Sequence, residues 1–220
     1  MGKNRAAEIL RILQGNFSLP RWARSTRDPF QTLIITVLSQ ATADINTARA
    51  FENLSGSFSI TPEALAEASV EEIEKAIRVG GLYRNKSRVI KAISRVVLEQ
   101  FDGSLDFIHS LPLDEARKNL LSIPGVGPKT ADVVLLFCAG KPTIPIDTHV
   151  NRVSKRLGLA PPKADYEEVR QALEALYSPD DYLPVHLLLI SLGRKYCKAR
   201  KPLCKPCPVN TLCPSKRIEN

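Results

Sequence analysis

Apolar residues recur at helical spacing along almost the whole chain of 220 residues. Between residues 30 and 38 they stand three and four positions apart, as one buried face of a helix requires. The same spacing returns in residues 45–54, 86–97, 150–157 and 169–176. No segment alternates apolar and polar residues as a half-buried strand does. The sequence therefore predicts an all-α fold of about ten helices joined by short connections.

Capping signals place several helix starts. In a capping box, a first polar side chain and a glutamate three residues later each accept a hydrogen bond from the other's backbone N–H. A threonine cap before a proline at the first helical position is a second such signal. The predicted starts are Thr61 with Pro62, Ser69 with Glu72, and Asp165 with Glu168. In residues 45–54, the inner face is expected at Ile45, Ala48, Phe51 and Leu54.

The chain is basic, which bears on its partners. Its 31 lysines and arginines against 23 aspartates and glutamates leave a net charge of +8 and an isoelectric point near 9.4. Such a surface suits a polyanion, most often nucleic acid, although a basic surface can also lack any such partner. The longest apolar run, Val133–Ala139, is far shorter than the ~20 residues of a membrane span. The N-terminal segment does not read as a secretory signal, so we expect no membrane association and a cytoplasmic, nucleoid-associated protein.

Four of the five cysteines crowd into one short stretch near the C-terminus. The fifth, Cys138, stands in the apolar run and is most simply a small core residue. The four are spaced C-x6-C-x2-C-x5-C, and disulfides are unexpected in a chain without an export signal. By spacing alone they could hold zinc or an iron–sulfur cluster, since four thiolates suit either. The predicted metal ligands are Cys197, Cys204, Cys207 and Cys213.

The stretch "SIPGVGPKTADVVLLF" (residues 122–137) predicts a tight turn followed by a helix. Gly125 and Gly127 can take positive φ and let another backbone approach closely. Pro128 suits the first helical position, where its missing N–H has no cost. The backbone N–H groups of such a helix start could receive a phosphate. An ordinary helical hairpin turn, with glycines for steric reasons, is the alternative interpretation.

Lys129 stands at the start of this predicted helix. The positive end of a helix disfavours an ammonium, and together with partial burial it should lower the pKa of the amine. A neutral amine can attack a carbonyl-like carbon, whereas most lysines at such a place are simply solvated. Asp147, within "IPIDTHVNRV", is expected to cap the next helix. Its carboxylate could also orient the amine, move protons or stabilise a developing cation.

Several of these motifs match one family in the same order. The stretches "LSIPGVGPKTADVV" and "PIDTHVNRV" resemble the helix-hairpin-helix and the glycine/proline-rich aspartate signature of the endonuclease III family of DNA glycosylases. "CKARKPLCKPCPVNTLC" resembles that family's 4Fe–4S loop, while "DPFQTLIITVLSQ" and "VGGLYRNKSRVI" resemble its first core helix and wedge loop. The resemblance runs from about Asp28 to Cys213, and hairpin, lysine, aspartate and cysteine loop together are highly specific.

The resemblance implies two helical lobes with an active-site cleft between them. One would be a central six-helix domain with the hairpin, residues 29–141, and residues 1–28 with 142–220 would form a terminal domain carrying the 4Fe–4S cluster. Lys129 would attack C1′ of the damaged nucleotide, displace the base and form a Schiff base, with Asp147 assisting. β-Elimination would then nick the strand. The implied partner is double-stranded DNA with a damaged base or abasic site, and we expect a monomer.

The resemblance also implies contacts with the DNA around a flipped base. Leu82 matches the family's wedge leucine. Gln40 stands where family members fill the gap left by the flipped base, although the alignment equally allows Ala41. The hairpin and the cysteine loop supply the remaining predicted DNA contacts, which are Gly125, Gly127, Lys198, Arg200 and Lys201.

The leading interpretation is therefore a glycosylase with AP-lyase activity that acts on oxidised pyrimidines. A second interpretation is a glycosylase for alkylated or mismatched bases. A third, of another class, is a non-catalytic helix-hairpin-helix protein that only binds DNA. Lys129 together with Asp147 argues against the third, because binding alone requires neither residue. By resemblance, relatives that only remove bases tend to carry another residue at the position of Lys129, so the lysine favours lyase activity.

Overall fold

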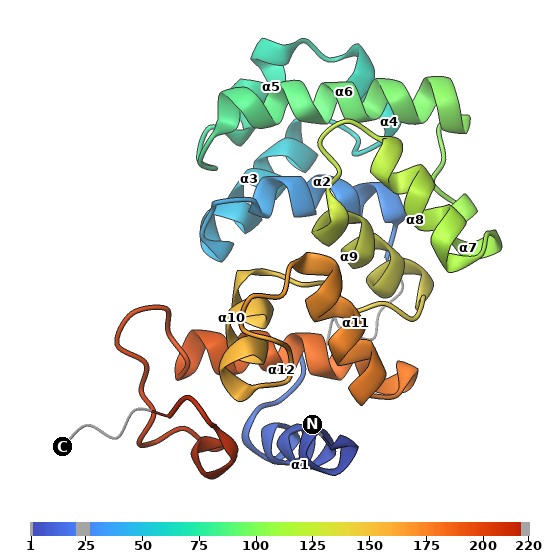
Figure 1. The fold of residues 1–220 in the computed structure, drawn as a ribbon. Helices are drawn as coiled ribbons and strands as arrows, with labels where there is room; N and C mark the ends of the chain where they lie inside the picture. The colour runs from blue at the N-terminus through green and yellow to red at the C-terminus, as the bar shows by residue number, and fades with distance from the viewer. Residues whose placement is uncertain (1, 21–26, 217–220) are drawn as a thin grey trace. The chain divides into compact units, whose positions relative to one another are not determined.

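The structure, a computed structural model, describes residues 2–20 and 27–216, and in these ranges it contains helices and turns but no strand (Figure 1). The predicted all-α fold is confirmed. Within the same ranges, no helix combines the length and the apolar character that crossing a bilayer demands. The chain forms two compact units, one of residues 26–141 and one of residues 1–25 with 142–220. We call them the continuous unit and the split unit.

In its described part, the continuous unit has eight α-helices. They are α2 (Pro29–Ser39), α3 (Asp44–Ser57), α4 (Pro62–Glu67), α5 (Val70–Ile77), α6 (Tyr83–Phe101), α7 (Phe107–Ser110), α8 (Leu113–Ser122) and α9 (Pro128–Ala139). Six helices were expected, and the difference lies in short elements, since α4 has only 6 residues and α7 only 4. The split unit contains α1 (Lys3–Asn16), α10 (Thr148–Leu157), α11 (Tyr166–Leu176), α12 (Tyr182–Lys195) and the short 3-10 helices η2 (Pro179–Asp181) and η3 (Asn210–Leu212).

Helix α2 is the core element of the continuous unit. It packs against α3, α6 and α9, with α6 on one side of it and α9 on the other (Figure 1). The apolar stripe predicted in residues 30–38 is buried throughout. Asp28 caps the helix, because its side chain accepts a hydrogen bond of 2.6 Å from the backbone N–H of Gln31. The helical period of this segment is therefore confirmed.

Helix α3 buries only part of the face that its sequence predicts, since Leu54 is buried and Phe51 packs half-buried against the core. Ile45 exposes 62% of its surface and Ala48 is also exposed. The buried residues are Thr47, Ala50 and Leu54. The cause is a tertiary contact: a Cβ added at Gly80 would stand 3.4 Å from the Cβ of Ala50, so the turn before α6 packs closely on this face. Close packing thus selects the small residue and leaves the isoleucine in solvent.

The predicted helix caps are present in the structure. The Thr61 side chain accepts from the backbone of Ala64, and both capping boxes are formed in both directions. Helix α6 begins at Tyr83, earlier than the expected start near residue 86, with Leu82 as its N-cap in the left-handed conformation. These starts depend on local hydrogen bonds, which is why the sequence locates most of them.

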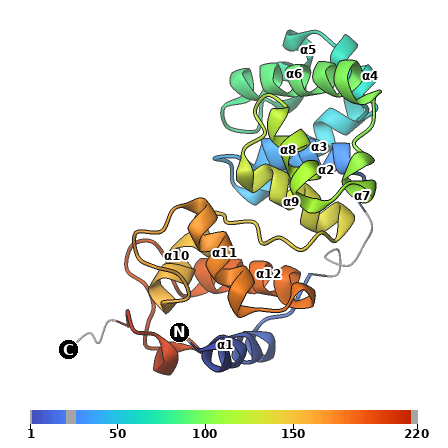
Figure 2. The same cartoon turned by 45° about the vertical axis from the view of Figure 1, so that its right-hand side comes forward.

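The split unit is organised around α12. This helix packs on α10 and on α1, and α11 packs on α10; α10, α11 and α12 are seen grouped together in Figure 2. Arg5 of α1 donates a hydrogen bond of 2.7 Å to the carbonyl of Leu157, at the end of α10, and a second one to the carbonyl of Leu212. The N-terminal helix is therefore tied to segments that lie far along the sequence.

The turn between α8 and α9 needs a glycine at one of its two glycine positions. Gly125 has φ +79, and a Cβ there would approach Cγ1 of Val89 to 2.6 Å. Gly127 is different: its φ is −92, its backbone is extended as the N-cap of α9, and an added Cβ would meet open space. The expectation of positive φ is therefore confirmed for Gly125 and wrong for Gly127.

This difference gives a stability test. Gly125→Ala should lower the free energy of unfolding by about 1–3 kcal/mol, because alanine is strained at this φ and its methyl group would displace Val89. Denaturant unfolding monitored by circular dichroism measures the change. The matched control, Gly127→Ala, should leave the free energy unchanged or raise it slightly. Equal losses in the two variants would contradict the assignment.

Candidate active site and cysteine pocket

The lysine predicted as nucleophile lies at the border of a buried helix face. Lys129 is the second residue of α9, after Pro128 at the first position and Gly127 as N-cap. The backbone amides of Thr130 and Ala131 both donate to the Gly127 carbonyl at 3.0 Å and close the first turn. Lys129 is half-buried, whereas these two following residues are buried. A well-formed helix start therefore carries Lys129 at the border between the buried face of α9 and solvent.

A buried ion pair fixes this helix start against α8. Asp132 is fully buried, and its carboxylate accepts from Arg117 twice: Nε to Oδ1 at 2.7 Å and Nη2 to Oδ2 at 3.2 Å. A two-point contact of this kind sets the rotation of α9 as well as its position. No sequence motif predicts this pair, although an aspartate within the apolar run "TADVVLLF" is a usable signal for a buried partner.

Asp147 is held firmly in the split unit. It is the N-cap of α10, and Oδ1 accepts a hydrogen bond of 2.7 Å from the backbone N–H of Val150, so its predicted capping role is confirmed. The segment before it is buried and anchored: the Ile146 amide donates to the Tyr166 hydroxyl at 3.3 Å, and His186 bonds the Pro145 carbonyl at 2.8 Å. The carboxylate is half-buried at the end of this anchored segment. The Val150 amide bonds Oδ1 of Asp147. Any chemical role of Asp147 would therefore be carried out by a carboxylate that also caps α10.

Two adjoining turns of the continuous unit carry the predicted DNA-inserting residues. Leu82 has φ +58 and exposes 63% of its surface, an unusual combination for a leucine. Gln40 is exposed at the end of α2, and Ala41 after it has φ +50. The turns lie against each other, since a Cβ at Gly81 would stand 3.5 Å from the Ala41 carbonyl oxygen and 3.6 Å from Oγ1 of Thr42. The structure thus brings Gln40, Ala41 and Leu82 into one neighbourhood.

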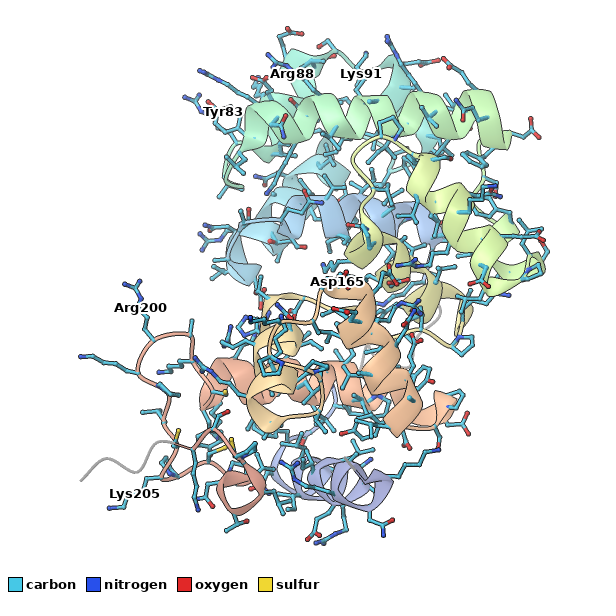
Figure 3. The ribbon with its side chains drawn as sticks, viewed as in Figure 1. Tyr83, Arg88, Lys91, Asp165, Arg200 and Lys205 are labelled. Atoms are coloured by element: carbon cyan, nitrogen blue, oxygen red, sulfur yellow. The ribbon has the colours of Figure 1, made fainter. Side chains whose placement is uncertain are left out.

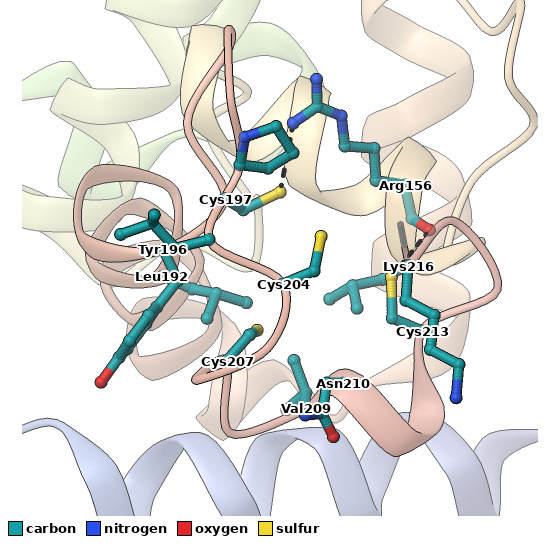
Figure 4. Close-up of a pocket in the computed structure, with 13 residues that line it drawn as sticks. Arg156, Leu192, Tyr196, Cys197, Cys204, Cys207, Val209, Asn210, Cys213 and Lys216 are labelled. Atoms are coloured by element: carbon teal, nitrogen blue, oxygen red, sulfur yellow. Dashed lines mark hydrogen bonds between the residues drawn. The ribbon is translucent and has the colours of Figure 1, made fainter. Parts of the chain in front are cut away.

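The predicted metal ligands line one pocket of the split unit (Figure 4). The pocket also has an apolar lining of Leu157, Leu192, Leu203 and Val209. Arg156 binds at two points of its edge: Nη1 lies 3.5 Å from Sγ of Cys197, and the Arg156 carbonyl accepts from Sγ of Cys213 at 3.5 Å. Across residues 2–20 and 27–216, no three histidine, cysteine, aspartate or glutamate side chains are placed to hold a single metal ion together. The four cysteines nevertheless all line the same pocket.

The chemistry of this donor set fits a metal–sulfur group. Burial raises the pKa of the Cys207 and Cys213 thiols, and negative charge on the neighbouring cysteines raises it further. Four thiolates in one pocket need a cationic group that compensates their charge. A metal ion or an iron–sulfur cluster would supply it, and four sulfur donors with an apolar lining suit either group.

The loop between the first two cysteines presents its cations to solvent. The Arg156 guanidinium donates to the carbonyls of Lys198 at 2.7 Å and Ala199 at 3.0 Å, which holds the loop backbone. The side chains of Lys198, Arg200 and Lys201 are exposed, and Figure 3 shows Arg200 directed away from the loop that carries it. The loop backbone is therefore held in place, and its positive charges are exposed on its outer side.

Comparisons with known proteins agree with these features. The family model of the HhH-GPD superfamily base excision DNA repair proteins matches residues 34–179. The endonuclease III of Sulfolobus acidocaldarius is 39% identical over 207 residues, which are 94% of this chain and 91% of that protein. The endonuclease III of Escherichia coli K12 is 36% identical over 216 residues, 98% of each chain.

Solved structures give the same result. A trapped endonuclease III–DNA covalent intermediate, an estranged-adenine complex, matches with a TM-score of 0.86 and 33% sequence identity over 98% of this chain and 97% of that chain. A thermostable thymine-DNA glycosylase has the same fold, with a TM-score of 0.81 at 24% identity, over 97% of each chain. The helical fold and the family match thus define a base excision DNA repair protein. Within the HhH-GPD superfamily, the chain belongs to the endonuclease III family, whose activity is that of a DNA glycosylase with AP-lyase function.

Proposed function

We propose that the chain removes oxidised pyrimidines from double-stranded DNA and nicks the resulting abasic strand through a Schiff base on Lys129. The main support is the place of this lysine, half-buried in the first turn of α9. A primary amine on a fixed helix start is a suitable nucleophile for the sugar carbon. The covalent protein–DNA intermediate of the structurally similar endonuclease III supports a covalent mechanism.

The proposed reaction has two chemical stages. First, Nζ of Lys129 forms a bond to C1′ while the bond from C1′ to the base nitrogen breaks, and the departing base takes up a proton. Opening of the sugar ring converts the adduct to an imine. Second, C2′ loses a proton and the bond from C3′ to its oxygen breaks, which releases the phosphate and nicks the strand. Water then hydrolyses the imine and returns the free amine.

Asp147 is the proposed assisting carboxylate. Negative charge favours the cation that develops at the sugar as the base departs. A carboxylate fixed as a helix cap loses little conformational freedom when it acts, since its position is already set by the Val150 amide. We therefore assign Asp147 both roles, capping α10 and assisting the displacement.

Leu82, Gln40 and Ala41 are the proposed inserting residues. The target base has to leave the helical stack before its C1′ can be reached, and an apolar wedge replaces the lost stacking contacts. The exposed Leu82 fits the wedge, and Gln40 or Ala41 fits the gap beside the unpaired partner base. An apolar side chain 63% exposed and held at positive φ has no evident role in the core of the unit.

Phosphate binding is assigned to the hairpin and the cysteine loop. The space in front of Gly127 admits a phosphate to the backbone amides, and Gly125 shapes the turn that presents them. Lys198, Arg200 and Lys201 add positive charge from the loop, in keeping with the net charge of +8. We propose a monomer that works on chromosomal DNA in the cytoplasm.

A 4Fe–4S cluster is the proposed occupant of the cysteine pocket, with Cys197, Cys204, Cys207 and Cys213 as ligands. When bound, it would tie the C-terminal segment together and supply the cationic iron that four thiolates need. No step of the reaction above depends on it.

The cluster assignment predicts colour. The purified protein should be brown, absorb broadly near ~400 nm and contain about four irons per chain. Cys207→Ser should lose most of the absorbance, because it removes a ligand. Cys138→Ala, which changes the one cysteine outside the pocket, should keep both colour and iron. Colourless wild-type protein with stoichiometric zinc would contradict the cluster.

The lysine assignment predicts covalent trapping. Borohydride should reduce the imine and leave a protein–DNA adduct on duplexes that carry an abasic site or an oxidised pyrimidine. Lys129→Gln should lower trapping and nicking at least about 100-fold while DNA affinity stays within about threefold. Lys75→Gln, an exposed lysine of α5, serves as the control. Trapping by Lys129→Gln at the wild-type level would show that another amine is the nucleophile. Faster action of the wild type on alkylated or mismatched bases would show that these, and not oxidised pyrimidines, are the substrates.

The aspartate assignment predicts a loss of rate without loss of fold. Asp147→Asn keeps the size and much of the capping capacity but removes the charge, so single-turnover nicking should slow about 100-fold. Asp165→Asn makes the same change at the N-cap of α11 and should leave the nicking rate unchanged. Thermal unfolding of both variants measures the capping effect separately. If the Asp147→Asn protein contains its full amount of iron but is unfolded, then Asp147 contributes only as the cap of α10.

A further inference from the structure

Lys86 is a buried lysine in the first turn of α6. Only 3% of its surface is exposed, although lysine is among the residues that proteins bury least. Its ammonium donates to the carbonyl of Leu38 at 2.7 Å and to Oγ1 of Thr42 at 2.6 Å, and both acceptors are uncharged. Burial lowers the pKa of this ammonium, so its environment works against the charge. An apolar residue at this position would avoid that cost, and the lysine therefore needs a reason beyond packing.

The side chain of Lys86 holds the turn that follows α2. The Thr42 hydroxyl, which accepts from Lys86, donates in turn to the Gln40 carbonyl at 3.1 Å. Together with the bond to Leu38, this network spans both ends of the turn that contains Ala41 with its φ of +50. A non-glycine residue keeps such a conformation only where its surroundings impose it, and the bonds of Lys86 supply that constraint.

The backbone of Lys86 holds the other turn. Its N–H donates to the Leu82 carbonyl at 3.0 Å, and the N–H of Asn85 donates to the same oxygen at 3.1 Å. Leu82 is the second residue here with positive φ, at +58. One residue thus bonds, through its main chain and its side chain, two turns that are far apart in sequence and pack on each other at Gly81.

We propose that Lys86 is a positioning residue that joins the turn of residues 40–42 and the turn of residues 79–82 into one preformed wedge for entry into the duplex. The inference rests on the proposed function, since it takes Leu82 and Gln40 or Ala41 as the inserting residues. A wedge that is already rigid loses less entropy on insertion than two separate flexible turns do. Lys86 acts through these turns and touches neither the DNA nor the reacting atoms.

The test compares duplex with single-stranded substrate. A preformed wedge matters only where a base has to be extruded from a stack, so Lys86→Met should slow single-turnover borohydride trapping on an abasic duplex by about tenfold. Trapping on the same abasic strand without its complement should stay within about twofold. The matched control is Lys91→Met, because Lys91 is also a lysine of α6 that bonds a backbone carbonyl, that of Ala68, which belongs to neither turn. Its ratio of duplex to single-strand rates should equal that of the wild type.

Two further measurements separate positioning from other roles. In a Leu82→Ala background, adding Lys86→Met should have little further effect on the duplex rate, since the wedge is already lost. The salt dependence of duplex affinity should keep its slope, whereas a lost phosphate contact would lower the slope by about one. The positioning role would be overturned if Lys86→Met lowered the duplex rate as much in the Leu82→Ala background as in the wild type. A shallower salt dependence of duplex affinity would overturn it too.

A substitution in the turn keeps the test decisive if Lys86→Met does not fold. Thr42→Val keeps the side-chain shape and removes the hydroxyl that links Lys86 to Gln40, so it should produce a smaller loss of the same duplex-specific kind. The wedge proposal would be refuted if a folded Lys86→Met, or Thr42→Val, changed the duplex rate and the single-strand rate by the same factor relative to wild type. The proposed lyase mechanism would still stand in that case, because the wild type is trapped. Absence of trapping by the wild type itself would instead overturn the proposed lyase mechanism.

Discussion

The contact between Gly125 and Val89 sets the position of the helix-hairpin-helix in the continuous unit. The left-handed glycine allows the turn to lie directly on the side of α6, at a separation that no Cβ could occupy. The same helix carries Leu82 at its N-terminus, next to the turn that follows α2. Helix α6 is therefore the common reference for the helix start that bears Lys129 and for the two exposed turns. Small displacements of α6 would be transmitted to all three.

The C-terminal segment of the split unit depends on arginines more than on a core. Arg152 donates to the Cys197 carbonyl at 2.9 Å and to the Gly193 carbonyl at 3.2 Å, while Arg156 holds the next two carbonyls of the loop. Several N–H groups on one planar guanidinium suit the closely spaced carbonyls of an irregular loop. The positive charge of this region is thereby divided. Arginines on α10 bind the loop backbone, and the cations of the loop itself remain available on its outer side.

The sequence located the features that depend on local chemistry. The stripe in residues 30–38, the capping boxes, the cap at Asp147 and the glycine at 125 all follow from spacing or from one residue's own preferences. The first half of the inner face of α3 could not be predicted, because Ile45 and Ala50 both fit a helical period and only the packing of Gly80 decides between them.

The positions missed in the candidate site are those with distant partners. Lys86 looks like a surface residue until its acceptors, 48 and 44 positions away in the chain, are known. The partner of Asp132, Arg117, is likewise on another helix. Sequence motifs single out Lys129 and the cysteines as candidates, because their residue type and spacing suggest a chemistry. The residues that hold these groups in place are determined by tertiary structure.

The split unit has a consequence for the order in which the protein is made. The continuous unit emerges from the ribosome as one stretch and can close its core while later residues are still being added. Helix α1 emerges before the continuous unit, but its partners are synthesised much later. These partners are α12, on which α1 packs, and the carbonyls that Arg5 binds. The apolar side chains of Ile9 and Leu13 therefore stay uncovered until α12 has been made. The cysteine loop follows α12 in the sequence, so its four thiols come together later still.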